Sequence, residues 1–190
     1  RSSGGAQNGT SASFGVVAGA ASAAQTTATV PAGQAGQVTT ITVQAKDALG
    51  NNRTTSSGTV TVSVSGANTA TATVVNNNDG TYTATYTPAN TGTDNITIRL
   101  SSTAISGSPY TSVVSAGGLD HFLITNTSNS NIGTQTASTS FNIRIRAKDA
   151  SNNDVTSFTG TVVLTSTGTL TGAPVTTASF GAGVLSSHRQ

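Results

Sequence analysis

An internal repeat constrains this chain more than any other feature. The 28 residues Thr39–Gly66 recur without a gap at Phe141–Gly168, and 11 of the 28 aligned pairs are identical. The offset of 102 residues is the size of a whole domain, whereas solenoid units repeat every 20 to 50 residues or so. The chain therefore contains two copies of one domain in tandem. Copying a whole domain adds length or valency, which favours a stalk, adhesin or filament over an enzyme.

Alternation of apolar and polar residues predicts the fold class. In the segment 59–64, for example, Val60, Val62 and Val64 alternate with threonine and serine, which is the pattern of a strand with one wet face. Similar segments predict seven strands in the first copy, near 26–30, 39–45, 59–64, 70–74, 81–86, 95–100 and 110–114. One wet face per strand indicates antiparallel sheets, and seven short strands in about 100 residues is the count of an immunoglobulin-like sandwich. We expect an all-β protein made of tandem immunoglobulin-like antiparallel sandwiches of the seven-strand type.

The repeat also predicts the domain boundaries. We expect a first domain at 20–116 and a second at 117–190, with 1–19 as a linker or the end of a preceding domain, because Phe14–Gly19 resembles Ser112–Gly117. The Ala-rich stretch 18–24 is interrupted by Gly19 and Ser22 and is predicted to be linker. The second copy lacks counterparts of the strands at 94–100 and 110–114. We therefore expect it to be incomplete, and expect the parent chain to continue or a neighbouring molecule to complete the fold.

Composition excludes several classes of function. Only 7% of the residues are charged, glutamate does not occur, and the net charge is +2 in spite of a pI of 9.4, so nucleic acid is not an expected partner. The absence of cysteine excludes disulfides and thiol chemistry. No apolar run approaches the ~20 residues needed to cross a bilayer, so membrane insertion is not expected.

Three short motifs in the first copy carry a family resemblance. Asp79-Gly80-Thr81-Tyr82, Tyr86-Thr87-Pro88 and the segment 105–110, Ile-Ser-Gly-Ser-Pro-Tyr, follow one another. In this order they resemble the second half of a filamin-type repeat. The segments around 45–51 and 147–153 resemble bacterial immunoglobulin-like surface repeats of the invasin and intimin type. The resemblance implies an immunoglobulin-like sandwich in a large exported protein, and by analogy with filamins it implies an edge strand at 58–65 that could accept a partner peptide.

Oxygen-rich loops suggest candidate calcium sites. Hard cations need several oxygen ligands together, and loops at one end of a sandwich lie close to one another. We expect one candidate site at the junction of the copies, formed by Asp120, Asp149, Asn152, Asn153 and Asp154. We expect another in the first copy, formed by Asp47, Asn51, Asn52 and Asp79. The spacing matches no EF-hand, and the alternative is that these side chains bind their own loop backbones. No other cofactor is expected.

Other candidate sites are weaker. Arg144, Arg146 and Lys148 alternate on one strand and could bind an acidic partner or glycan, or they could form a solvated outer face. Lys46 and Lys148 follow inward alanines, which predicts an outward position and argues against an isopeptide cross-link. His121 lies beside Asp120, but no catalytic motif accompanies it. Asn8, Asn52, Asn95 and Asn126 begin candidate N-glycosylation sequons.

These observations favour a non-enzymatic role. We expect a structural segment of an extracellular, multidomain surface protein, with neighbouring immunoglobulin-like domains, and copies of the chain itself, as partners. The alternative is a glycan- or partner-binding accessory module of a larger secreted protein. Sugar sites usually present exposed aromatic rings; tryptophan is absent, and only Tyr110 is expected to be available. A hydrolase has the weakest support, since no paired carboxylates are evident.

Overall fold

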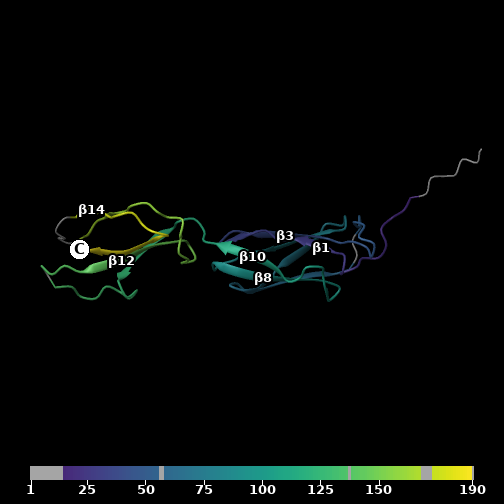
Figure 1. The fold of residues 1–190 in the computed structure, drawn as a ribbon, viewed down its shortest axis with the longest axis horizontal. Helices are drawn as coiled ribbons and strands as arrows, with labels where there is room; N and C mark the ends of the chain where they lie inside the picture. Colours follow the sequence, from purple (N-terminus) through teal and green to yellow (C-terminus); the bar gives the residue numbers. More distant parts are fainter. Residues whose placement is uncertain (1–14, 56–57, 137, 168–172, 190) are drawn as a thin grey trace, which may run out of the picture.

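The computed structural model describes residues 15–55, 58–136, 138–167 and 173–189. These residues contain no helix, and therefore none that could cross a bilayer. The all-β, immunoglobulin-like expectation is confirmed, and 18–24 is not helical. Asn8 and Gly168 lie outside the described residues. Figure 1 shows two sandwiches end to end along one long axis.

Two sheets face each other in the first sandwich. The first has the order β1-β3-β7-β6, all antiparallel, with β1 at Thr27–Thr29, β3 at Thr39–Gln44, β7 at Thr81–Tyr86 and β6 at Thr73–Asn76. The second has the order β2-β10-β8-β4-β5, with β2 at Gly33–Gln34, β10 at Tyr110–Ser115, β8 at Gly92–Leu100, β4 at Val60–Gly66 and β5 at Ala70–Thr71. The short β9, Thr103–Ala104, pairs with the end of β8.

The core of the first sandwich follows the predicted alternation. Ile41 and Val43 on β3 face Ile96 and Ile98 on β8, and all four are fully buried. Tyr82 also lies in this core, as expected. Because each strand contributes every second residue, the sandwich is filled by small β-branched side chains and needs few aromatic rings.

The segment 70–74 departs from the expectation of one strand. It divides into β5, which pairs with β4, and β6, which pairs with β7 in the opposite sheet. The chain crosses between the sheets at the buried Ala72, whose amide still donates to Val62 O at 3.0 Å. β4 is therefore not a free edge along its whole length, because β5 covers Ser63 and Val64. Peptide addition at 58–65 stays a prediction, restricted to the part that β5 leaves uncovered.

The second sandwich repeats three of the four strands in the first sheet of the first sandwich. Its strands have the order β11-β12-β15 and lie at His121–Asn126, Asn142–Lys148 and Val184–Arg189. They correspond in order and direction to β1, β3 and β7. The opposite layer is represented by the pair β13, Val163–Leu164, and β14, Val175–Thr176. Counterparts of β8 and β10 do not occur among the described residues after 120. The boundaries 20–116 and 117–190 stay predictions.

Aromatic rings fill the core of the second sandwich. Phe158 packs edge-on against Phe122 and Phe180, with ring centroids 5.2 and 5.0 Å apart. Ile143 and Ile145 of β12 complete the cluster. This core differs from the mainly aliphatic core of the first sandwich, although three strands of each copy pair in the same way.

Candidate functional site

One buried aspartate holds the loop that follows β3 in the first sandwich, and an equivalent aspartate holds the loop that follows β12 in the second. Asp47 is 4% exposed and Asp149 is 2% exposed. Asp149 accepts hydrogen bonds from the backbone amide two residues later at 2.9 Å, and from the backbone and side-chain amides of Asn153 at 2.8 and 2.9 Å. Asp47 accepts the same set, at 3.0 Å from two residues later and at 2.9 and 3.0 Å from Asn51. Aspartate serves here because its short carboxylate reaches its own loop.

The same aspartates also bind the segment that enters each domain. Oδ2 of Asp149 accepts the backbone amide of Gly117 at 2.9 Å, and Oδ2 of Asp47 accepts the amide of Gly19 at 3.0 Å. A Cβ on Gly117 would lie 2.9 Å from the carbonyl oxygen of Ala35, so a larger residue would force the backbone to move. Each entering segment is thus fixed by the domain that follows it.

Asn153 connects the two sandwiches directly. Its Nδ2 donates to the carbonyl of Ala89 at 2.7 Å, and its Oδ1 accepts the backbone amide of Thr91 at 3.2 Å. Both partners lie in the loop between β7 and β8 of the first domain, at the end where the two sandwiches of Figure 1 meet. The second hydrogen of Nδ2 serves Asp149. One amide side chain therefore joins the loop of the second domain to the loop of the first.

The first domain holds the loop 89–91 in place through a buried polar network. Oδ1 of Asn68 accepts the backbone amides of the first two loop residues, both at 2.9 Å. Asn68 in turn donates to Asp94 from its backbone at 2.8 Å and from its side chain at 3.1 Å. Asp94 is fully buried and also accepts the hydroxyl of Tyr86 at 3.0 Å. The sequence did not reveal this network, since its members come from different loops and strands and only the fold brings them together.

Hydrogen bonding keeps the junction aspartates ionised. The side-chain amide of Asn51 and the backbone amide of Gly19 lower the pKa of Asp47 to about 2. Burial opposes the ionisation of Asp149, but the hydrogen bonds from Asn153 and Gly117 outweigh it, and its pKa also lies below the ordinary value. An ionised carboxylate accepts stronger hydrogen bonds than a protonated carboxyl group. The hydrogen bonds of both aspartates are therefore at their strongest at neutral pH.

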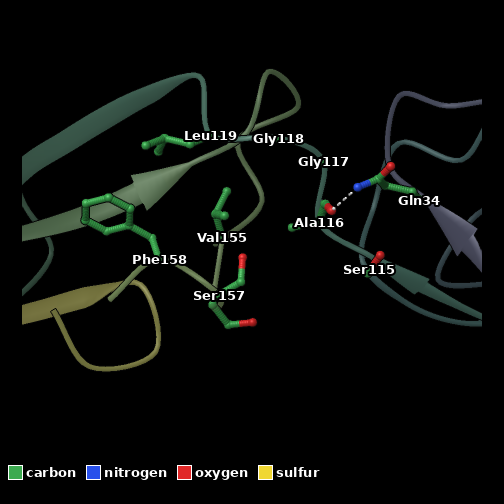
Figure 2. A pocket seen from close by; sticks show the side chains of 10 residues that line it. Gln34, Ser115, Ala116, Gly117, Gly118, Leu119, Val155, Ser157 and Phe158 are labelled. Carbon is green, nitrogen blue, oxygen red and sulfur yellow. Dashed lines mark hydrogen bonds between the residues drawn. The ribbon is translucent and has the colours of Figure 1, made fainter. Parts of the chain in front are cut away.

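A cleft of about 520 Å³ lies beside the junction. Figure 2 shows Gln34 on the side of the first domain, where its amide donates to the carbonyl of Ala116 at 3.3 Å, and Leu119, Val155 and Phe158 on the side of the second. Phe158 is its only aromatic residue. The cleft thus separates two walls that the linker 115–118 joins.

The family of the chain follows from its sequence together with this fold. The sequence model of the filamin/ABP280 repeat matches residues 16–111, which is half of the chain. The chain belongs to the filamin repeat family. A comparison with curated proteins gave no match.

Two solved structures are similar in fold to this chain. The chain is similar to FdeC, an Escherichia coli adhesin, with 28% identity and a TM-score of 0.54 over 78% of this chain and 48% of that one. Its fold is also similar to that of invasin, a bacterial integrin-binding protein, with 18% identity and a TM-score of 0.53 over 77% of this chain and 30% of that one. The chain spans about half or less of the length of these two structures.

The acidic residues proposed as calcium ligands lie in or beside loops, where the structure gives each of them hydrogen-bond or ion-pair partners. Asp120 binds His121 at 2.9 Å, Asp79 accepts the amide of Thr81 at 2.9 Å, and Asp154 pairs with two cations. Asp47 and Asp149 accept N–H donors as described above, and no group of three or more acidic or histidine side chains suited to a metal occurs within the described ranges. As arranged, the carboxylates of these residues accept N–H donors or pair with cations, and the calcium sites stay a prediction.

The expectation of a solvated outer face is wrong at Lys148. This residue is buried, and its ammonium lies 2.8 Å from Asp154 and donates to the carbonyl of Asn152. Arg146 also pairs with Asp154. Burial opposes the ionisation of Asp154, but the bonds and charges of the two cations outweigh it and lower its pKa. The junction loop folds back over the strand, which alternation alone does not predict. Partner binding by the stripe with Arg144 stays a prediction, with two of its cations already engaged.

The remaining candidates are placed as follows. Asn52 and Asn95 are exposed, while the side chain of Asn126 accepts backbone amides of its own turn at 2.9 and 3.0 Å. Glycosylation at these positions, and at Asn8, stays a prediction. Tyr110 is not an open platform, because it is half-buried and its hydroxyl donates to the carbonyl of Ser106 at 2.5 Å. No aromatic side chain among the described residues is exposed.

Proposed function

We propose that this pair of filamin-type domains is a stiff, non-enzymatic segment of an extracellular surface protein, of the stalk or adhesin kind. The observation that supports the proposal is the junction, in which Asn153 and Asp149 bind both the linker and the loop 89–91 of the preceding domain. A flexible string of domains would need no such bonds. The similarity to an Escherichia coli adhesin supports the cellular setting.

Geometry indicates what such a segment contributes. The nine residues of β8 span about 30 Å at ~3.3 Å per residue, so each sandwich adds a length of this order along the axis of Figure 1. With a junction of fixed direction, lengths add linearly instead of as a random walk. The chain then projects whatever lies beyond it away from the surface. Because only 7% of residues are charged, we expect the stiffness to change little with salt.

Spin-label distances test the proposal. The chain has no cysteine, so Thr61→Cys and the equivalent Val163→Cys, both at exposed strand positions, place one label on each domain. Pulsed electron–electron resonance should give one narrow distance distribution. Asn153→Ala removes the two interdomain bonds and should broaden it, whereas Asn52→Ala, an exposed residue away from the junction, should not.

A broad distribution in the unmodified junction would refute the rigid spacer. So would a narrow one that Asn153→Ala leaves unchanged, because the bonds described here would then not set the angle. Circular dichroism of each labelled variant confirms that both sandwiches are folded.

A further inference from the structure

The N-terminal end of the first domain carries the same half-junction that the second domain uses. The hydrogen bonds of Asp149 with Asn153 and Gly117 have equivalents in the first domain, formed by Asp47 with Asn51 and Gly19. The glycine amides lie 3.0 Å from Asp47 and 2.9 Å from Asp149. The backbone amides of the asparagines lie 2.9 Å from Asp47 and 2.8 Å from Asp149, so the two sets of bonds have the same geometry. In the second domain this arrangement receives another domain. In the first domain it faces the end of the molecule away from the second.

The entering segments also match in register. Ser22 donates its backbone amide to Lys46 O at 2.8 Å, and Asp120 donates to Lys148 O at 2.8 Å. Each of these donors comes three residues after the glycine that the aspartate binds. A domain that ended in the segment Ala18–Gly19 would therefore enter at the place and in the direction of the first domain at Ala116–Gly117.

The side chain of Asn51 has a free donor and a free acceptor among the described residues, whereas the equivalent atoms of Asn153 bind the first domain. Its Nδ2 donates one hydrogen to Asp47 at 3.0 Å, while its Oδ1 and its second N–H have no partner among the described residues. Asn51 is exposed and Asn153 is half-buried. Asn153 is less exposed because the loop 89–91 of the first domain lies against it. The site on the first domain thus offers one fixed donor and one fixed acceptor.

We propose that Asp47 and Asn51 form a docking site for another filamin-type domain, joined through Ala18–Gly19. The partner must present a backbone carbonyl and, two residues later, a backbone amide in an exposed loop, as Ala89 and Thr91 do. A loop of this kind, braced from inside its own sandwich, matches the site in both polarity and spacing. This inference rests on the proposed spacer function and extends it to a second junction of the same angle.

One residue distinguishes the two half-junctions. Arg53 stands where Val155 lines the cleft of the existing junction, and its guanidinium donates to the carbonyl of Gly19 and to the hydroxyl of Thr55. The cation binds the carbonyl of the same glycine whose amide binds Asp47. It adds to the grip on the linker, and it predicts that the partner contributes oxygen atoms to the corresponding wall.

A three-domain chain tests the inference. The three-domain chain consists of an added copy of residues 20–117 followed directly by residues 20–190. Ala116–Gly117 of the added copy then stand where Ala18–Gly19 stand in the original chain. Thr61→Cys in the added copy and in the original first domain reports the new junction. Thr61→Cys in the original first domain together with Val163→Cys reports the existing junction in a second sample.

The expected result is a distribution at the new junction as narrow as at the existing one, with a mean distance that agrees within a few ångströms. Asn51→Ala in the original first domain should broaden only the distance distribution of the new junction. Asn153→Ala should broaden only that of the existing junction. Asn52→Ala is the matched control and should broaden neither. A broad new junction beside a narrow existing one overturns the inference alone, as does a narrow new junction that Asn51→Ala does not affect. A broad existing junction overturns the spacer function instead.

Discussion

Replacing Asp94 by alanine should destabilise the first domain more than any exposed substitution. Asp94 is fully buried and accepts the amide of Asn68 at 2.8 Å and the hydroxyl of Tyr86 at 3.0 Å. Alanine leaves both donors inside the sandwich without this acceptor, and each such loss costs about 1–3 kcal/mol. The sum is about 2–6 kcal/mol, a large part of the ~5–15 kcal/mol by which a domain is stable.

Urea unfolding followed by tyrosine fluorescence measures this change. All three tyrosines, Tyr82, Tyr86 and Tyr110, lie in the first domain and tryptophan is absent, so the signal is specific to that domain. Asp94→Asn is the matched variant: it keeps the shape and one acceptor oxygen, and should cost about 1 kcal/mol because one hydrogen bond is weakened. If Asp94→Ala moved the midpoint no further than Thr61→Ala on the exposed face of β4, the network would not hold the loop 89–91 and the reasoning would fail.

Three further outcomes follow. The pKa of Asp47 is about 2 in the folded chain and about 3.9 when unfolded. Its contribution to the stability of the first domain is therefore complete above about pH 5 and is lost progressively as pH falls towards 2; urea midpoints against pH should show this loss, and Asp47→Asn should reduce it. Gly80→Ala should destabilise the first domain by about 2 kcal/mol or more, measured by the same fluorescence, because φ is +86° and a Cβ would lie 1.9 Å from the carbonyl of Arg53. Phe158→Ala should cost the second domain about 3–5 kcal/mol, since it opens the aromatic core; hydrogen exchange of β12 should then accelerate while β3 stays protected.

The strands were predictable because burial in a two-layer sandwich imposes a period of two. Ile41 and Val43, or Val60 and Val62, alternate with threonine and serine, and the structure buries them as expected. The break at Ala72 was not predictable, because a chain that changes sheets keeps the same alternation on both sides of the crossing. The two-residue strand β2 was missed for another reason: it pairs in parallel with β10, and two residues carry no period.

The junction was predictable only in part. The repeat aligns Asp47 with Asp149 and Asn51 with Asn153, and the sequence allowed these aspartates either to bind their own loops or to ligate calcium. The sequence offered no signal for the partners Ala89 and Thr91, since they contribute backbone atoms that any residue supplies. Lys148 was misplaced because a loop folded back over the strand end covers a position that strand geometry leaves outside.

The chemistry of the junction explains why polar residues are repeated there while core residues are free to differ. An apolar contact between two sandwiches can slide, because burial has no direction. The amide of Asn153 has fixed donor and acceptor directions, and Asp149 accepts one of its hydrogens. In the proposed spacer, the bonds of Asn153 to Ala89 and Thr91 therefore set the angle between the two domains. The core can change from aliphatic in the first domain to aromatic around Phe158 in the second without altering that angle. In the proposed spacer, the Asp and Asn present in both copies give successive junctions the same bonds, and equal junctions would turn a row of domains into a regular rod.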